Sequence, residues 1–369
     1  MPKLLSPFDL RSVELENRIV VSPMCQYSAH DGVASDWHLV NLGQFALGGP
    51  GLVFFEATHV SPEARITPWC LGLYGDEHER GMRRIVDFIH GNSQSKIGVQ
   101  LAHAGRKASV AVPWEGGAPI TDSRGWQPVA PSALPFTSDG PSVRALDAPG
   151  LAKIRRDFVD ATRRCLRMNA DVIELHFAHG YLVHQFLSPL SNVRTDAYGG
   201  SLENRMRFAL ELFDDVRAAW PAEKALGVRI SATDYVAGGW NLDESIIFSR
   251  ELSARGCDFI DVSSGGLSPL QKIDPTPGYQ VPFSRAIRDA VDIATIAVGM
   301  ILDPRHAERI VAEGDADLVA LARGMIRDPH WAWGAADELG GTVFAPNQYA
   351  RGRASHYQRP AGVDAQTPK

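Results

Sequence analysis

The chain of 369 residues has few cysteines, and its four, Cys25, Cys70, Cys165 and Cys257, are widely scattered. It contains no Cys-x-x-Cys pair, which argues against a zinc ribbon, an iron–sulfur centre and a thioredoxin-like redox motif. Four cysteines could form two disulfides, but a chain of this length can bury a sizeable core without them. We therefore expect free thiols, as is usual in a cytosolic protein.

The chain also lacks a block of one charge and any long hydrophobic run. Its 37 basic and 43 acidic residues give a formal net charge of −6 at pH 7. Neither a nucleic acid nor a membrane surface is expected as a partner, because both would require a basic patch. The apolar runs have only strand length, and the first residues show no signal-peptide core. These features favour a cytoplasmic protein.

Nucleotide-binding motifs are missing as well. No Gly-x-Gly-x-x-Gly follows an apolar run, and no Gly-Lys-Ser/Thr phosphate loop occurs. Their absence weakens the doubly wound parallel sheet, which is the main structural alternative for an α/β chain of this length.

What the sequence does contain is one unit repeated eight times: a strand-length apolar run, a polar loop and a segment with helical period. The apolar runs are residues 19–24, 51–57, 96–102, 172–176, 225–231, 259–263, 295–299 and 318–322. The helical segments are residues 36–47, 77–90, 149–169, 202–219, 242–255, 282–290, 303–313 and 328–339. Eight such units predict a (β/α)8 barrel, which we place as one domain at residues 1–340.

Two stretches fall outside this repeat. Residues 104–147 are rich in Pro, Gly, Trp and Ser and have no helical period, and their tryptophans, Trp114 and Trp126, argue against disorder. We predict that they form a capping insertion after the third strand. Residues 341–369 form a polar, helix-poor tail, and we expect its end, residues 361–369, to be frayed.

Chemistry in such barrels takes place at the carboxyl ends of the strands. The fourth apolar run leads into His176, His179 and Tyr181, which lie on a bend marked by Gly180. Two histidines three residues apart could hold one carbonyl or anionic oxygen, with Tyr181 as a proton donor. Metal binding is an alternative, but no third ligand is evident. The histidines could also be structural, each satisfied by backbone carbonyls.

Other strand ends suggest an anion site. Gly299, Arg323 and Gly324 follow the last two apolar runs, where barrels commonly bind phosphate. Gln100 and Arg229 are expected to point inward, and a guanidinium there suits a ligand that develops negative charge. Taken alone, Arg323 would more often be a salt-bridge partner.

At this point the residues resemble those of a known family. The chain is similar over nearly its full length to the Old Yellow Enzyme family of flavin-dependent ene-reductases, and most of all to the thermophilic-like subclass that includes xenobiotic reductase A. The matching stretches are residues 17–19, 22–27, 36–38, 56–58, 65–67, 100–108, 176–182, 186–189, 194–205 and 322–325, together with Asn192.

The resemblance implies noncovalent FMN at the top of the barrel. Pro23, Met24, Ala57 and Gln100 would line the isoalloxazine ring, and Arg229 would lie near its N1/C2 carbonyl region. A positive group there stabilises the reduced flavin. The phosphate and ribityl positions would be Gly266, Gly299, Arg323 and Gly324.

The resemblance also implies a reaction. His176 and His179 would hold the substrate carbonyl, hydride would pass from flavin N5 to the β-carbon, and Tyr181 would protonate the α-carbon. NADPH or NADH would then reduce the flavin again in the same pocket, in ping-pong order. The expected substrates are activated alkenes: enones, enals, maleimides and nitro compounds.

Four further positions carry over from the subclass. Cys25 would tune the flavin potential and touch the substrate, although a lone cysteine is more often a small core residue. Tyr27 would contact the substrate, and Lys107 matches a position near the flavin. Arg351 would enter the active site of a neighbouring subunit, which implies a homodimer or a dimer-based tetramer.

Other functions were weighed against this one. The dienoyl-CoA-reductase-like branch needs an iron–sulfur cysteine cluster and a further dinucleotide domain, which four scattered cysteines and this length do not support. A phosphate-binding barrel lyase or isomerase would need a Schiff-base lysine or an acid–base carboxylate at a strand end. A catalytically silent binding barrel is the third alternative, and the complete set of His176, His179 and Tyr181 argues against it.

Overall fold

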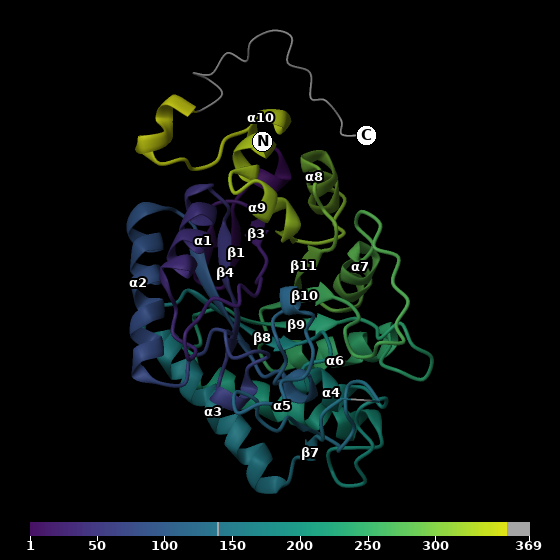
Figure 1. The fold of residues 1–369 in the computed structure, drawn as a ribbon. Coiled ribbons are helices and arrows are strands. Elements are labelled where there is room, and N and C mark those ends of the chain that lie inside the picture. Colours follow the sequence, from purple (N-terminus) through teal and green to yellow (C-terminus); the bar gives the residue numbers. More distant parts are fainter. Residues whose placement is uncertain (139, 353–369) are drawn as a thin grey trace.

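The computed structural model describes residues 1–138 and 140–352, and its main feature is a closed barrel of eight parallel strands (Figure 1). Neighbours around the barrel follow the order β10-β11-β12-β3-β4-β5-β8-β9. The strands are β3 (Ile19–Val21), β4 (Leu52–His59), β5 (Lys96–Ala102), β8 (Val172–Phe177), β9 (Leu226–Ser231), β10 (Phe259–Ser263), β11 (Ala294–Val298) and β12 (Leu318–Leu321). The predicted (β/α)8 barrel is confirmed.

Helices surround the barrel, and most begin and end within two residues of the predicted segments. They are α1 (Asp36–Leu47), α2 (Asp76–Asn92), α3 (Ala148–Arg167), α5 (Leu202–Ala219), α6 (Leu242–Ala254), α7 (Val281–Ala290), α8 (Pro304–Ala312), α9 (Arg323–Arg327) and α10 (Trp331–Leu339). The predicted helix at 328–339 is wrong at its start, because Pro329 disfavours a helical Asp328. Asp328 is extended, and α9 and α10 are separate helices.

A hairpin that the sequence pattern did not predict closes the amino end of the barrel. Strands β1 (Phe8–Leu10) and β2 (Val13–Leu15) are antiparallel and only three residues long, too short to show an alternating pattern. Leu10, Val13 and Leu15 pack in one cluster with the residues at the start of the barrel strands, such as Leu52 and Val172. The hairpin therefore plugs the barrel at the end opposite the strand carboxyl ends.

Side chains fill the barrel in layers, because alternate residues of each strand point inward. The lowest layer holds two phenylalanine rings, Phe54 and Phe259, with centroids 6.5 Å apart. Gly98 and Gly227 make room for them: a Cβ atom at either position would lie 2.3 Å from the nearest ring atom.

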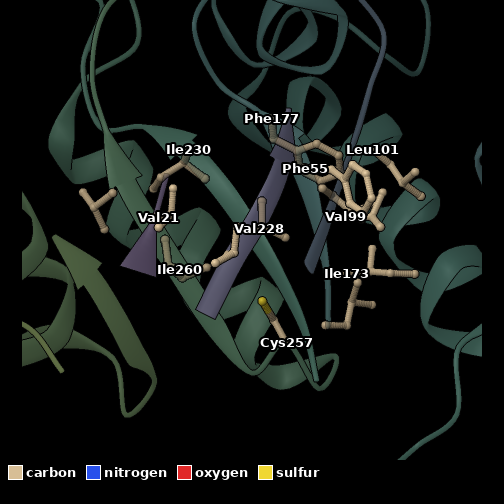
Figure 2. Packing of buried hydrophobic residues seen from close by; sticks show 14 of the residues in the cluster. Val21, Phe55, Val99, Leu101, Ile173, Phe177, Val228, Ile230, Cys257 and Ile260 are labelled. Atoms are coloured by element: carbon tan, nitrogen blue, oxygen red, sulfur yellow. The ribbon is translucent and has the colours of Figure 1, made fainter. Parts of the chain in front are cut away.

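Two residues further toward their carboxyl ends, the same strands carry polar side chains, which form a second layer inside the barrel. The strands end about two residues beyond that layer. The intervening residues point outward and pack against the helices, as Ile173, Val228 and Ile260 do in Figure 2.

The segment 104–147 is folded. It contains the short 3-10 helices η3 (Gly105–Lys107) and η4 (Pro113–Glu115), and its strands β6 (Val129–Ala130) and β7 (Arg144–Ala145) pair with each other. The indole of Trp126 donates a hydrogen bond to the carbonyl of Glu63 at 2.9 Å. That the segment caps the barrel stays a prediction.

Between α10 and residue 352, the described chain contains one further element, the 3-10 helix η5 (Asn347–Gly352). The predicted fraying of residues 361–369 concerns positions outside the described residues. Within the described part, none of the helices combines the length and the apolar character needed to cross a membrane.

Candidate active site

The site begins with a buried polar layer inside the barrel. Gln100 on β5 donates a hydrogen bond to Glu174 on β8 at 2.7 Å. The Nε atom of Arg229 on β9 lies 3.3 Å from a carboxylate oxygen of Asp261 on β10. Arg229 also donates to the Ser22 hydroxyl at 3.1 Å, so the layer extends to the end of β3. Gln100 and Arg229 point into the barrel, as the sequence predicted.

Burial opposes a negative charge on two acids in this layer, Glu174 and Asp261. Burial raises the pKa of Glu174 well above its ordinary value, and the neighbouring Asp261 raises it further. Burial also raises the pKa of Asp261. One oxygen of each carboxyl group is buried without another hydrogen-bond partner, which a proton held between them would satisfy. The pair then carries one negative charge opposite the positive Arg229. The sequence reasoning missed both acids, because they lie within apolar strands.

Above this layer, His176 and His179 face each other. Their rings are nearly perpendicular, with centroids 5.1 Å apart, and Nε2 of His176 lies 3.4 Å from Nδ1 of His179. The Nδ1 atom of His176 accepts a hydrogen bond from the backbone N–H of Ala178 at 3.3 Å. The Nε2 atom of His179 lies 2.7 Å from the hydroxyl of Ser263, at the end of β10. Nothing in the sequence, beyond the place of Ser263 at the end of an apolar run, marks it as a neighbour of His179.

Both histidines are neutral at pH 7. Burial lowers the pKa of His176 and of His179 well below the ordinary value, and the nearby Arg229 lowers both further. In the described part of the chain, no group of three or more His, Cys, Asp or Glu side chains is arranged to hold a metal ion.

The loop that carries these side chains is tightly constrained. His179 has a φ of 57° and Gly180 one of 71°, and a Cβ atom on Gly180 would lie 2.2 Å from the carbonyl oxygen of Gly266. The backbone N–H of Gly180 donates to His184 Nδ1 at 2.9 Å. His184, on the short helix α4 (Leu182–Leu187), pairs in turn with Asp234 at 2.9 Å. The sequence gives no sign of this pair, because His184 and Asp234 are far apart in the chain and meet only in the folded protein.

Tyr181 lies beside the histidines. Its ring contacts that of His176 edge to face, with centroids 5.0 Å apart. Burial raises the pKa of Tyr181 well above its ordinary value, so the side chain is a neutral phenol with a proton to give. Tyr181 packs with Cys25 and Tyr27 against a small apolar cluster that includes Cys70.

The loop after β3 carries Cys25 and Tyr27, and Glu56 fixes its position. The backbone N–H of Gln26 donates to one carboxylate oxygen of Glu56 at 2.9 Å, and His38 of α1 lies 3.1 Å from the other. Tyr27 adopts a φ of 50°, which is uncommon for a residue other than glycine. Burial raises the pKa of the Cys25 thiol well above its ordinary value, so it is not a thiolate. All four cysteines are free.

A cavity of about 180 Å3 lies at the ends of β11 and β12. Arg229, Gly299 and Arg323 are among the residues that line it. Gly299 has a φ of 130°, and a Cβ atom there would lie 2.9 Å from the Gln280 side chain. Among the described residues, no carboxylate pairs with Arg323, and its guanidinium contacts only the Met300 sulfur. The cavity therefore offers an uncompensated cation to an anion.

The remaining predicted cofactor positions lie at the same end of the barrel. Pro23 and Met24 follow β3 directly, and Ala57 lies where the pairing of β4 with β5 shifts register. Gly266 follows β10, with a φ of 89°, and Gly324 is the second residue of α9. FMN carries a phosphate, a polyol and a flat ring with polar edges. The unpaired Arg323, the open Gly299 backbone and the inward Gln100 and Arg229 fit such a group.

Arg351 is not brought to this site. It lies exposed on η5, whose residues Gln348 and Tyr349 line a second cavity together with Leu47 at the end of α1 and Gly91 near the end of α2. In this barrel the helices run opposite to the strands, so the carboxyl ends of α1 and α2 lie at the amino end of the barrel. Arg351 is therefore at the far end of its own barrel from His176.

Comparison with known proteins assigns the family. Residues 3–340 match the model of the NADH:flavin oxidoreductase / NADH oxidase family. The chain is 43% identical over 353 residues to an NADPH dehydrogenase of Geobacillus sp. (strain WCH70), which covers 95% of this chain and 98% of that protein. It is also 43% identical over 352 residues to an NADPH dehydrogenase of Bacillus subtilis (strain 168), at 95% and 99% coverage.

A solved structure agrees with these matches. Morphinone reductase in complex with tetrahydroNAD superposes with a TM-score of 0.76 at 28% identity, covering 99% of this chain and 100% of that one. The chain therefore belongs to the NADH:flavin oxidoreductase / NADH oxidase family and is an oxidoreductase of the Old Yellow Enzyme type, with FMN as its cofactor and a reduced nicotinamide as its reductant.

Proposed function

We propose that this enzyme reduces the carbon–carbon double bond of activated alkenes, namely enones, enals, maleimides and nitro compounds, in ping-pong order. One observation carries the proposal: the facing nitrogens of His176 and His179 converge beside the Tyr181 phenol. Two hydrogen-bond donors next to a proton donor suit a conjugated carbonyl or nitro group. Membership of a redox family speaks against the lyase or isomerase alternative.

The two histidines bind and polarise the substrate oxygen. Because Nδ1 of His176 accepts from the Ala178 N–H, the ring proton lies on Nε2. The Ser263 hydroxyl donates to Gln280 Oε1 at 3.3 Å, so it accepts from Nε2–H of His179 and leaves Nδ1 of that ring as the acceptor of the His176 Nε2–H, 3.4 Å away. For both rings to donate to one substrate oxygen, the Ser263 hydroxyl would turn to donate to Nε2 of His179, which moves the proton of that ring to Nδ1. An oxygen held by both rings draws electron density from the alkene and makes its β-carbon electrophilic.

FMN supplies the hydride to the β-carbon and takes it from NADPH or NADH. The chain's own part in the next step is the proton: the Tyr181 O–H bond breaks and a C–H bond forms at the α-carbon. Arg229, Gln100, Pro23, Met24 and Ala57 would hold the flavin ring. The phosphate and ribityl chain would be held by Gly266, Gly299, Arg323 and Gly324.

Cys25 and Tyr27 would form the substrate wall that faces Tyr181, since the three side chains pack together. Arg351 would complete the site of a second copy, because it lies at the far end of its own barrel. The assembly proposed with it is a homodimer or a dimer-based tetramer.

An anaerobic visible spectrum of the purified protein tests the proposal. NADPH should bleach the flavin band, and 2-cyclohexenone should restore it. Tyr181→Phe should slow the restoration and leave the bleaching unchanged, while Tyr198→Phe, which loses only a hydroxyl bonded to Glu211 on α5, should change neither. If NADPH bleaches the flavin band but none of the four alkene classes restores it, the proposed alkene reaction is wrong.

A further inference from the structure

Lys107 links two loops of the site. It ends η3, and its ammonium donates hydrogen bonds to the carbonyl of His179 and to the carbonyl of Gly266, each at 2.9 Å. The first carbonyl belongs to the loop after β8 and the second to the loop after β10. One side chain thus holds the backbone of a predicted substrate ligand against a predicted cofactor loop.

The same ammonium faces two aromatic rings. Its nitrogen lies 5.0 Å from the centroid of the Tyr181 ring and 4.9 Å from that of Phe136. Both distances fall within the range of cation–π attraction.

The charge of Lys107 is uncompensated. No carboxylate in the described part of the chain forms an ion pair with it, whereas Lys153 pairs with Glu63 at 2.6 Å and with Asp157 at 2.7 Å. Burial, together with the neighbouring Arg106, lowers the pKa of Lys107 to about 8. A cation turned inward without a counter-ion is costly, and such groups gather at functional sites.

Proton transfer from Tyr181 creates the missing counter-ion. When the O–H bond breaks, its electron pair stays on the phenolic oxygen and spreads into the ring. Burial disfavours this phenolate, because it raises the pKa of Tyr181. A cation close to the ring stabilises the phenolate more than the phenol, since it attracts the added negative charge.

We propose that Lys107 is a positioning residue for proton delivery: its ammonium stabilises the Tyr181 phenolate and fixes the loop that carries His179. This inference rests on the proposed function. Solvent water then returns a proton to the phenolate, so the cycle consumes one proton for each alkene reduced. A purely structural lysine would make the two carbonyl bonds but would have no effect on proton transfer.

Single-turnover kinetics of the FMN-loaded enzyme separate the two roles. Lys107→Met should slow the oxidation of the reduced enzyme by 2-cyclohexenone about 10- to 30-fold, the effect of losing one desolvated cation–π contact. Its reduction by NADPH and its FMN content should stay unchanged. Lys224→Met is a matched control, because Lys224 also donates to a backbone carbonyl, that of Ala170, and lies 5.2 Å from the Trp220 ring.

A second readout does not depend on turnover. In protein labelled with 13C at tyrosine Cζ, the resonance missing from Tyr181→Phe belongs to Tyr181. It should titrate at lower pH in Lys107→Arg, which keeps its charge where the phenol ionises, than in Lys107→Met. An identical titration in these two variants would overturn the proposal, as would equal loss of both half-reactions together with FMN.

The pH dependence gives a third check. The groups around the ammonium are Arg106, His176, His179, the Tyr181 and Phe136 rings and the two carbonyls. Alkene reduction should fall as pH rises through about 8, where Lys107 loses its charge. Lys107→Arg should abolish this fall, and its persistence would count against the proposal. If Tyr181→Phe reduces alkenes as fast as the wild type, Tyr181 is not the proton donor and that part of the proposed function is wrong. A Lys107→Met variant that reduces alkenes as fast as the wild type is a separate result, which counts against Lys107 alone.

Discussion

The hydroxyl of Ser263 lies 2.7 Å from Nε2 of His179, on the side of the ring away from His176. A single hydroxyl at the end of one strand can therefore decide which nitrogen of a histidine on another strand carries the proton.

This relationship predicts the effect of Ser263→Ala. Without the hydroxyl, His179 loses the group that could donate to Nε2 and so place the ring proton on Nδ1, and kcat/KM for 2-cyclohexenone should fall about 5- to 10-fold, corresponding to roughly one hydrogen bond. Steady-state kinetics with saturating NADPH measure it. Ser249→Ala, which removes a buried hydroxyl bonded to Ser245 on α6, should have no such effect. Equal values for both variants would show that Ser263 does not act through His179.

The barrel's two inward glycines predict a stability difference. Gly98→Ala places a Cβ atom 2.3 Å from the Phe54 ring and should lower the free energy of unfolding by about 1–3 kcal/mol. Gly334→Ala, on α10 with nothing within 4 Å of the new Cβ, should raise it by about 0.5–1 kcal/mol. Urea unfolding of both variants measures the difference. A neutral Gly98→Ala would mean that the phenylalanine rings repack freely.

Two buried histidines predict loss of stability in acid. Burial lowers the pKa of His59 to about 4 and that of His103 to about 3, whereas an unfolded histidine titrates near 6.5. As pH falls below about 6.5, the unfolded chain gains protons that the folded chain does not. Each histidine should therefore reduce the free energy of unfolding by about 1.4 kcal/mol per pH unit, down to its own folded pKa.

Urea unfolding between pH 7 and pH 4 measures this slope. His103→Gln should make the slope shallower by the contribution of one histidine, and the variant should retain more of its pH 7 stability at pH 4.5 than the wild type does. An unchanged slope in His103→Gln would show that His103 is protonated in the folded protein.

Arg351 gives a prediction about assembly. Because η5 lies at the amino end of its own barrel, Arg351→Ala should raise KM for the alkene without changing FMN content, and only in the oligomer. Steady-state kinetics alongside analytical ultracentrifugation test it. Arg163→Ala, an exposed arginine on α3 paired only with Asp160, is the control. Unaltered kinetics of Arg351→Ala in an intact oligomer would rule out its role as a shared residue.

Local patterns were enough to predict most of the fold. Segment 36–47, predicted from its helical period, begins and ends as predicted, with Ser35, a favoured N-cap, before it and a glycine at position 48 after it. The β1–β2 hairpin and α4 were not predicted, because three-residue strands and a six-residue helix are too short to show the hydrophobic periodicity that reveals strands and helices.

The site was predictable where chemistry stands next to a strand end, as with His176, His179 and Tyr181, which the structure brings together; their roles stay predictions. Contacts between distant segments were not predictable. Asp234 meets His184, and Asp261 meets Glu174, only once the strands are neighbours. Nothing in the sequence around Asp234 or Asp261 distinguishes these acids from residues of an ordinary loop or strand.

The β1–β2 hairpin has a consequence for the order of events in catalysis. Since Leu10, Val13 and Leu15 fill the amino end of the barrel, molecules can reach the polar layer only from the carboxyl end of the strands. In the proposed reaction, nicotinamide and alkene would then bind one after the other through the same opening. An excess of nicotinamide or of alkene should inhibit binding of the other, so the turnover rate should pass through a maximum as the ratio of the two concentrations is varied.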